Sequence, residues 1–287
     1  MIHRLIAQWE KKVEISRLCR LLLVSRSGFY AARARRARPV RVCAQSLHLK
    51  AAFAASGECY GSRRLCAALQ AQGVRIGRYR ARSLMKAQGL RACWRRKFLH
   101  TTDSRHALPV ADNVLNRQFS PTAPNRAWVA DITYVRTRRG WLYLAAVLDL
   151  FSRRVVGWAM APTMPAQLVC RALSMALTLR APTTGLLVHS DRGSQYASTD
   201  HQALLAAHQA VGSMSRKGNC WDNAVMERFF LNLKMERVWR RDYANPLEAQ
   251  ADISDYLVNF YNTKRLHSTL NYRSPADYER EMAVATP

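Results

Sequence analysis

The stretch Ala127-Trp-Val-Ala-Asp131-Ile-Thr-Tyr-Val135 decides the fold of the second half of the chain. Its side chains fall into two alternating sets, which is the period of two of a β-strand. Asp131 lies in the middle of this strand, where a buried carboxylate without a neighbouring cation is costly. Either an arginine pairs with Asp131, or Asp131 binds a cation.

The sequence on either side of this strand predicts an α/β core. Two further β-rich runs follow a turn at 138–140, and helical and strand-like segments then alternate. Their order is βββαβαβα, with a three-stranded meander first. The segments are strands at 141–148, 153–160, 185–189 and 211–214 and helices at 165–180, 198–210 and 222–239, with a last helix at 247–262 before a basic, aromatic tail.

Two more acidic residues occupy favourable places in this core. Asp191 directly follows the apolar run 186–189, and functional groups of open α/β sheets gather just beyond the carboxyl ends of parallel strands. Glu227 lies on the long helix, on one stripe with Asn223 and Lys234. The alternatives are an ordinary turn aspartate at 191 and a solvated polar stripe on the helix.

Together these three acids indicate a chemistry. Convergent carboxylates can hold two divalent cations, which activate one oxygen and stabilise the leaving oxygen of a phosphodiester. We therefore expect Asp131, Asp191 and Glu227 to cluster within roughly 10 Å and to bind metal. On the same helix stripe, Lys234 can hold a DNA phosphate as a point charge, and Asn223 is a further candidate DNA contact.

The charge balance implies a polyanionic partner, most often nucleic acid. The 287 residues include 45 Lys+Arg against 19 Asp+Glu, a formal net charge of +26. Residues 1–120 carry a net +20 and residues 121–287 only +6. The first part is therefore expected to grip phosphates, while the second retains carboxylates for chemistry.

Helical segments fill the basic first part. Residues 1–43 form a helical unit, either a helix-turn-helix or an amphipathic hairpin, whose second helix is capped by Ser25 or Ser27. Residues 44–99 give the clearer helix-turn-helix: a helix at 44–55, a second opening at a Ser62 cap and ending at Gly73, and a third beginning at Arg78.

Six basic residues of this second unit are candidate DNA contacts. Arg80, Arg82 and Lys86 lie on the predicted recognition helix, while Arg95, Arg96 and Lys97 form an arm that follows phosphates. Residues 100–126, with three prolines, are expected to be a linker, 127–240 the catalytic core and 241–287 a C-terminal helix and tail.

The seven cysteines are scattered and never form a CxxC pair, so no zinc-ligand spacing occurs. Free thiols in a reducing cytosol are the favoured interpretation. Neither a long apolar span nor a signal-like start is present, which argues against a membrane or secreted protein.

Three long strings resemble the insertion-sequence transposases of the IS-three type, in particular the product of their second reading frame. They are Trp128-Val-Ala-Asp131-Ile-Thr-Tyr134, His189-Ser-Asp191-Arg-Gly-Ser-Gln-Tyr196 and Ser213-Met-Ser-Arg-Lys-Gly-Asn-Cys-Trp-Asp-Asn-Ala-Val-Met-Glu227. The resemblance continues through Phe260-Tyr-Asn262 and Arg265-Leu-His-Ser-Thr-Leu270 to Ser274-Pro275.

This resemblance implies an RNase H-like core of the retroviral-integrase type, with Asp131, Asp191 and Glu227 as a DDE triad. It implies two Mg²⁺ (or Mn²⁺) ions per site. Water and then a DNA 3′-hydroxyl attack phosphorus in line, and no serine or tyrosine becomes covalently attached. The implied partners are the element's terminal inverted repeats, target DNA, further copies of the chain and the first-frame protein or a fusion with it.

Two other functions remain open at this stage. The chain can be a DNA-binding accessory subunit of the fused transposase, catalytically silent by itself. Less favoured is an RNase H-like nuclease acting on hybrids or junctions. For every alternative the expected location is the bacterial cytoplasm, at the nucleoid.

Overall fold

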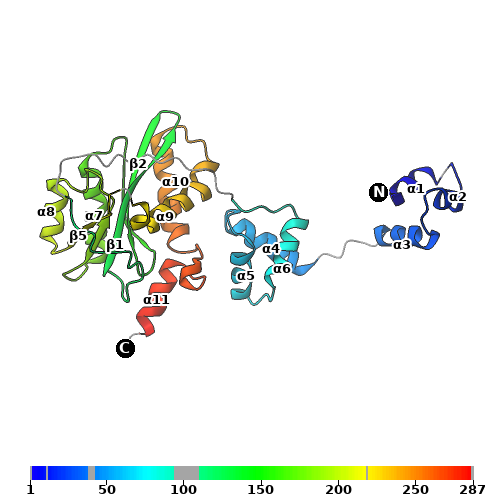
Figure 1. Cartoon of the computed structure of the whole chain (residues 1–287), viewed down its shortest axis with the longest axis horizontal. Helices are drawn as coiled ribbons and strands as arrows, with labels where there is room; N and C mark the ends of the chain where they lie inside the picture. The colour runs from blue at the N-terminus through cyan, green and yellow to red at the C-terminus, as the bar shows by residue number, and fades with distance from the viewer. Residues whose placement is uncertain (1, 11, 38–42, 94–109, 218, 286–287) are drawn as a thin grey trace. The chain divides into compact units, whose positions relative to one another are not determined.

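The computed structural model describes residues 2–10, 12–37, 43–93, 110–217 and 219–285 (Figure 1). The chain forms two compact units, Met1–Leu47 and His48–Pro287. Arg95, Arg96 and Lys97, the predicted phosphate-tracking arm, lie outside the described residues.

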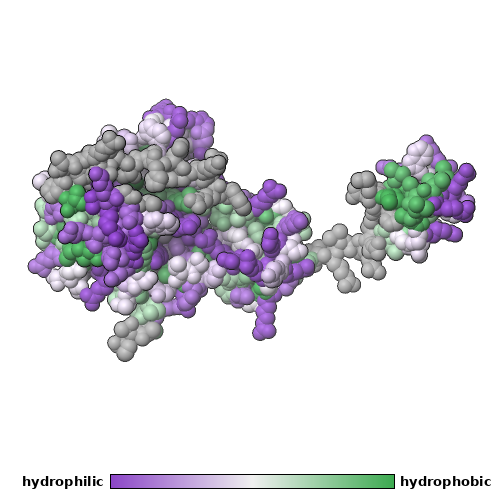
Figure 2. Space-filling view, in the orientation of Figure 1, coloured by the Kyte–Doolittle hydropathy of each residue, from purple (hydrophilic) through white to green (hydrophobic). Residues whose placement is uncertain are grey.

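The first unit is helical, as its sequence predicts. It contains α1 (Ile2–Trp9), α2 (Ile15–Leu21) and α3 (Arg26–Ala37). The Gly28 amide donates to the Ser25 hydroxyl at 3.0 Å, so Ser25 is the cap of α3. The first helix was not predicted, and hydrophobic surface remains exposed on this unit (Figure 2).

The helix-turn-helix segment consists of α4 (Ala44–Ala55), α5 (Ser62–Ala71) and α6 (Arg78–Ala87). Helix α5 follows Gly61 and has no side-chain cap, so the predicted Ser62 cap is wrong and Ser62 is the first helical residue. Gly73, with φ +78°, ends the turn after α5 in a backbone conformation that favours glycine. The buried residues include Leu49, Phe53, Leu65, Leu69, Ile76, Ala81, Leu84 and Met85.

A five-stranded sheet follows, and it confirms the predicted element order. Its strands are β1 (Ala127–Thr137), β2 (Gly140–Asp149), β3 (Val155–Ala161), β4 (Leu187–Ser190) and β5 (Val211–Met214). The spatial order is β3-β2-β1-β4-β5. The first three strands form an antiparallel meander, and β4 and β5 run parallel to β1.

Helices cover both faces of the sheet (Figure 1). Helices α7 (Ala166–Arg180) and α8 (Thr199–Ala207) pack on the face that carries Trp128 and Ala130. On the opposite face, α9 (Ala224–Glu236) and α10 (Pro246–Asp255) pack over Val129 and Val135. Because side chains alternate along a strand, Asp131 belongs to the face that α9 covers.

Close packing fixes α7 against the sheet. A Cβ atom added at Gly157 of β3 would lie 2.2 Å from the carbonyl oxygen of Ala172, so only glycine allows this approach.

The C-terminal part differs from its prediction in two ways. The predicted helix 222–239 is interrupted, because short 3₁₀ turns at Cys220–Asn223 and Val238–Arg240 flank α9. The predicted tail contains a further helix, α11 (Pro275–Ala285). Glu279 of α11 accepts from Arg154, Arg180 and Ser152, which fastens this helix to the core.

Helix α10 continues into a π-helical turn at Tyr256–Tyr261. Among the described helices, none combines the length and apolar character that a membrane crossing requires.

Candidate active site

The pairing of β1 with β4 places two of the predicted acids side by side. Val129 pairs with His189 in parallel register, and the same offset carried two residues further brings Asp131 opposite Asp191. Neighbouring strand paths lie about 4.8 Å apart, and residues in register point to the same face. Since β4 ends at Ser190, Asp191 stands just beyond a carboxyl strand end, as the sequence indicates.

Local hydrogen bonds hold both carboxylates. The Ile132 amide donates to Asp131 Oδ1 at 2.7 Å, which is possible because β4 pairs with β1 only at 127–129. The Gly193 amide donates to Asp191 Oδ1 at 2.9 Å. Each aspartate therefore lies where the pairing of β1 with β4 has ended, and a backbone amide holds one of its oxygens.

Glu227 lies on α9, the helix that packs over this face of the sheet. Met226, Phe230 and Leu233 bury one face of α9 against the core, while Glu227 itself is exposed in the first turn. The predicted arrangement, in which one face packs and another presents a carboxylate, describes this part of α9.

The three carboxylates interact electrostatically. Burial raises the pKa of Asp131 well above its usual value, and the charges of Asp191 and Glu227 raise it further. The hydrogen bond from Ile132 and the charge of Lys234 act in the opposite direction. The site is therefore a concentration of negative charge that a cation would stabilise.

The environment of Lys234 differs from the one that the sequence predicts. The sequence predicts a lysine on an open stripe, but the side chain is buried, with Nζ 4.8 Å from the centre of the Tyr134 ring. Burial lowers the pKa of Lys234, and the nearby Asp131 carboxylate opposes that change. The ammonium group is thus a neighbour of the carboxylates inside the site, a position that helix periodicity alone does not reveal.

Asn223 is also buried, only 5% exposed, directly before α9. Neither its amide nitrogen nor its amide oxygen has a hydrogen-bond partner within the described part of the chain. A buried amide without partners is costly, so this position is suited to a polar ligand.

Asp222, beside Asn223, organises the segment that leads into α9. Its buried carboxylate accepts from Arg216, from Arg117 Nε at 2.8 Å and from Asn113 Nδ2 at 2.8 Å. Burial by itself would raise the pKa of Asp222, but the hydrogen bonds from Arg216 and Arg117 bring it well below the usual value. Asp222 thereby ties Arg216 to the segment 113–117.

His189 is a structural residue. Its ring nitrogens lie 2.9 Å from the Ser213 hydroxyl and 3.3 Å from the Ser215 hydroxyl. Burial lowers the pKa of His189 to about 4, so the ring is neutral near pH 7.

The predicted recognition helix presents its basic residues to solvent. Arg80, Arg82 and Lys86 of α6 are exposed, while Ala81, Leu84 and Met85 are buried. Two exposed aromatic residues were missed by the sequence interpretation: Tyr79 on α6, 84% exposed, and Trp221 before α9, 69% exposed. A single aromatic residue in a basic or polar segment is a weak sequence signal, and only exposure distinguishes these two from core residues.

Carboxylate oxygens are the ligands that Mg²⁺ and Mn²⁺ prefer, so the donor set fits such ions. Among the described side chains, no three His, Cys, Asp or Glu residues already stand in the arrangement of a metal site.

Comparison with known proteins defines the class of the chain. An integrase core domain matches residues 121–220, a second integrase core model matches 210–275, and an HTH-like domain matches 44–98. The chain is therefore an integrase-core protein, with a mixed α/β catalytic fold preceded by a helical, HTH-like region.

Curated relatives define the family. The chain is 42% identical over 286 residues to the transposase InsF for insertion sequence IS3A of Escherichia coli K12, covering 98% of this chain and 99% of that protein. It is 43% identical to the insertion element IS600 uncharacterized 31 kDa protein of Shigella sonnei, over 92% and 98% of the two chains. The chain belongs to the transposase family of the IS3 insertion sequences, so the transposase interpretation stands and the silent accessory subunit is not favoured.

Solved structures with a similar chain path include two viral integrases. The simian T-cell lymphotropic virus intasome in complex with PP2A regulatory subunit B56 gamma matches with a TM-score of 0.47 and 14% identity, over 74% and 69% of the two chains. The HTLV-2 integrase catalytic core domain in complex with magnesium matches with a TM-score of 0.44 and 16% identity, over 55% and 98%.

Proposed function

We propose that this transposase is a DDE-type polynucleotidyl transferase whose ligands for divalent metal are Asp131, Asp191 and Glu227. The observation that carries this proposal is the parallel register of β1 and β4, which sets Asp131 opposite Asp191 under α9. The raised pKa of Asp131 supports it, because burial and the neighbouring charges of Asp191 and Glu227 all disfavour the ionised carboxylate in the absence of a cation.

Two Mg²⁺ or Mn²⁺ ions bound here would lower the pKa of the attacking water or 3′-hydroxyl and stabilise the leaving oxygen of the phosphodiester. Asp131 on β1 and Asp191 directly after β4 provide the fixed part of the site. Glu227 closes the site from α9. Lys234, buried beside Asp131, balances part of the negative charge and offers an ammonium to a phosphate of the entering strand.

The direct test uses a labelled DNA duplex that ends in the element's terminal repeat. Cleavage and joining to target DNA are expected with Mg²⁺ or Mn²⁺ and are expected to be lost with EDTA. Equal activity in EDTA would exclude the metal mechanism.

The buried amide of Asn223 supports a role in DNA binding. Its unpartnered donor and acceptor match a phosphate oxygen, a sugar hydroxyl or a base edge. We include the exposed Trp221 in the same surface, since a base or sugar can stack on its ring. Both residues flank Asp222, whose carboxylate forms ion pairs with Arg117 and Arg216.

Replacing Lys234 separates the charge role from a packing role. Lys234→Ala is expected to slow strand transfer and to weaken binding of the DNA at the end of the element, because the positive charge beside Asp131 is removed. Lys234→Arg keeps the charge and should retain much of the activity. Rates for each variant at sub-saturating DNA check this, and wild-type rates for Lys234→Ala would contradict it.

The basic helix α6 is proposed to read the terminal repeat. Replacing Arg80 or Arg82 by Ala should cost about 1–3 kcal/mol of preference for the repeat over random DNA if the contact is to a base. Replacing Arg95, Arg96 and Lys97 together should weaken binding to all DNA sequences alike and reduce the dependence of DNA affinity on salt concentration. Binding curves at several salt concentrations measure both effects, and unchanged preference in the Arg80 and Arg82 variants would refute the assignment.

The partners that fit this function are the terminal repeats, target DNA, further copies of the chain on DNA, and the first-frame protein or a fusion with it. We place this work at the nucleoid in the bacterial cytoplasm, where the transposon DNA lies.

A further inference from the structure

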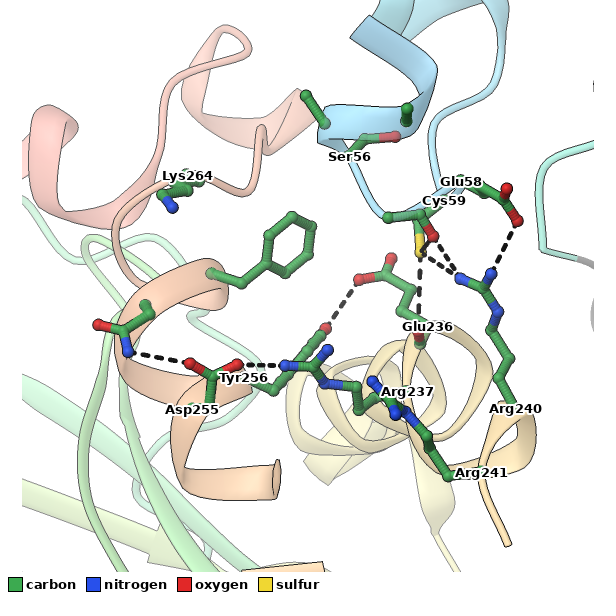
Figure 3. A pocket seen from close by; sticks show the side chains of 15 residues that line it. Ser56, Glu58, Cys59, Glu236, Arg237, Arg240, Arg241, Asp255, Tyr256 and Lys264 are labelled. Atoms are coloured by element: carbon green, nitrogen blue, oxygen red, sulfur yellow. Dashed lines mark hydrogen bonds and ion pairs between the residues drawn. The ribbon is translucent and has the colours of Figure 1, made fainter. Parts of the chain in front are cut away.

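A buried polar junction joins the last residue of α9 to the C-terminal part of the chain. Glu236 ends α9, and its side chain is only 4% exposed. Arg265, whose side chain is 1% exposed, donates to both carboxylate oxygens of Glu236, at 2.7 and 2.8 Å. The Tyr256 hydroxyl donates to the same carboxylate at 2.7 Å (Figure 3).

The helix-turn-helix segment takes part in this junction. Arg64 of α5 lies 3.9 Å from Glu236, and its guanidinium stands over the Tyr60 ring. The Tyr60 hydroxyl donates to the Lys264 carbonyl at 3.2 Å and accepts from the Leu266 amide at 2.7 Å. These contacts bracket Arg265 in the sequence and attach α5 to the same few residues that hold Glu236.

A second set of contacts lies beside the first (Figure 3). Arg240, just after α9, donates to Glu58 at 2.9 Å and to the Gly57 carbonyl, and the Cys59 thiol faces the Glu236 carbonyl at 3.7 Å. The turn between α4 and α5 therefore also rests on the end of α9.

The chemistry of this junction indicates a role beyond holding the two helices together. Burying an ion pair costs desolvation, and apolar residues of similar volume would often hold two elements together at least as well. A bidentate arginine–carboxylate pair adds directional geometry, which apolar packing lacks. The junction fixes how α5 and α9 lie relative to each other.

We propose that Glu236 and Arg265 are a positioning pair that registers the helix-turn-helix segment against the catalytic helix α9. This inference rests on the proposed function. Helix α9 carries Glu227 and Lys234, while α5 supports the recognition helix α6. The pair thereby sets, within one chain, the distance between the DNA sequence that α6 reads and the phosphate that is cut.

The test compares end-specific cleavage with cleavage that does not need the helix-turn-helix. The variants are Glu236→Gln, which keeps the shape, and the double variant Glu236→Met with Arg265→Met, which keeps a buried, uncharged junction. The matched control is Arg138→Met, which breaks the exposed pair with Asp242. Cut positions on labelled terminal-repeat DNA are mapped at nucleotide resolution, and Mn²⁺-dependent nicking of a plasmid without repeats is measured in parallel.

Both junction variants are expected to nick the plasmid like wild type and to bind terminal-repeat DNA within about threefold of wild type. End-specific cleavage should fall by at least about tenfold and spread to neighbouring phosphates, because a misplacement of about 1 Å can cost about 100-fold in rate. The Arg138 control should cut at the wild-type position and rate.

Cuts at the wild-type position, with an unchanged ratio of specific to non-specific cleavage, would overturn the proposal. An equal fall in end-specific cleavage and in plasmid nicking would also overturn it. That result would mean that the fold is lost, and not that the helix-turn-helix segment has shifted relative to α9. Because Glu236→Gln leaves the buried Arg265 charge without its carboxylate, the uncharged double variant decides between these outcomes if Glu236→Gln does not fold. A wild-type protein that cuts neither substrate contradicts the proposed function instead.

Discussion

Asp131→Asn, Asp191→Asn and Glu227→Gln are each expected to abolish strand cleavage and joining while DNA affinity stays at or above the wild-type value. Each change keeps the side-chain shape and removes a negative charge that a metal ion needs as ligand. Because metal stabilises the transition state by several kcal/mol, the rate should fall about 10³-fold or more. Affinity should not fall, because a negative charge near the phosphates has been removed.

The matched control for these variants is Asp242→Asn. Asp242 is an exposed acid paired with Arg138, and the same chemical change there should leave cleavage unaffected. Cleavage and joining on terminal-repeat DNA, together with binding by titration, measure both sides of the prediction. Near-normal cleavage by any of the three variants would show that its residue is not a ligand.

Arg265→Leu is expected to destabilise the fold by about 3–5 kcal/mol, because it removes the cation that donates to both oxygens of the buried Glu236 carboxylate. The double change Arg265→Leu with Glu236→Leu should recover much of that loss, since the uncompensated charge is removed as well. Arg138→Leu, at an exposed ion pair, should cost about 1 kcal/mol or less.

Denaturant unfolding of these variants, followed by near-ultraviolet and far-ultraviolet signals, measures the stability differences. A single Arg265 variant that is no less stable than the Arg138 control would mean that Glu236 is not held as a charged group. A double variant as unstable as the single one would show that packing volume, and not the ion pair, dominates the junction.

Local patterns predicted most elements because their cause is local. Gly73 marked the end of the helix before it, and its positive backbone φ is one that glycine favours. The period of two in β1 and the order of the later strands gave the meander and the parallel pair. Asp131 and Asp191 could be paired in advance only in outline, since the sheet register depends on the whole core.

Other features could not be predicted because they depend on contacts between distant segments. Helical spacing put Lys234 on a stripe with Glu227, but the Tyr134 ring that covers it comes from β1. The Glu236–Arg265 pair joins residues 29 positions apart, and no spacing rule links them. Helix α11 lacks a strong apolar stripe and is held by ion pairs of Glu279, so its sequence resembles a tail.

The most direct test of the central claim is anomalous diffraction from crystals of the protein bound to terminal-repeat DNA and Mn²⁺. We predict two manganese peaks at the carboxyl end of β4, with oxygens of Asp131 and Asp191 at coordination distance and Glu227 completing the shell. Manganese bound elsewhere while these three carboxylates contact only protein groups would contradict the account.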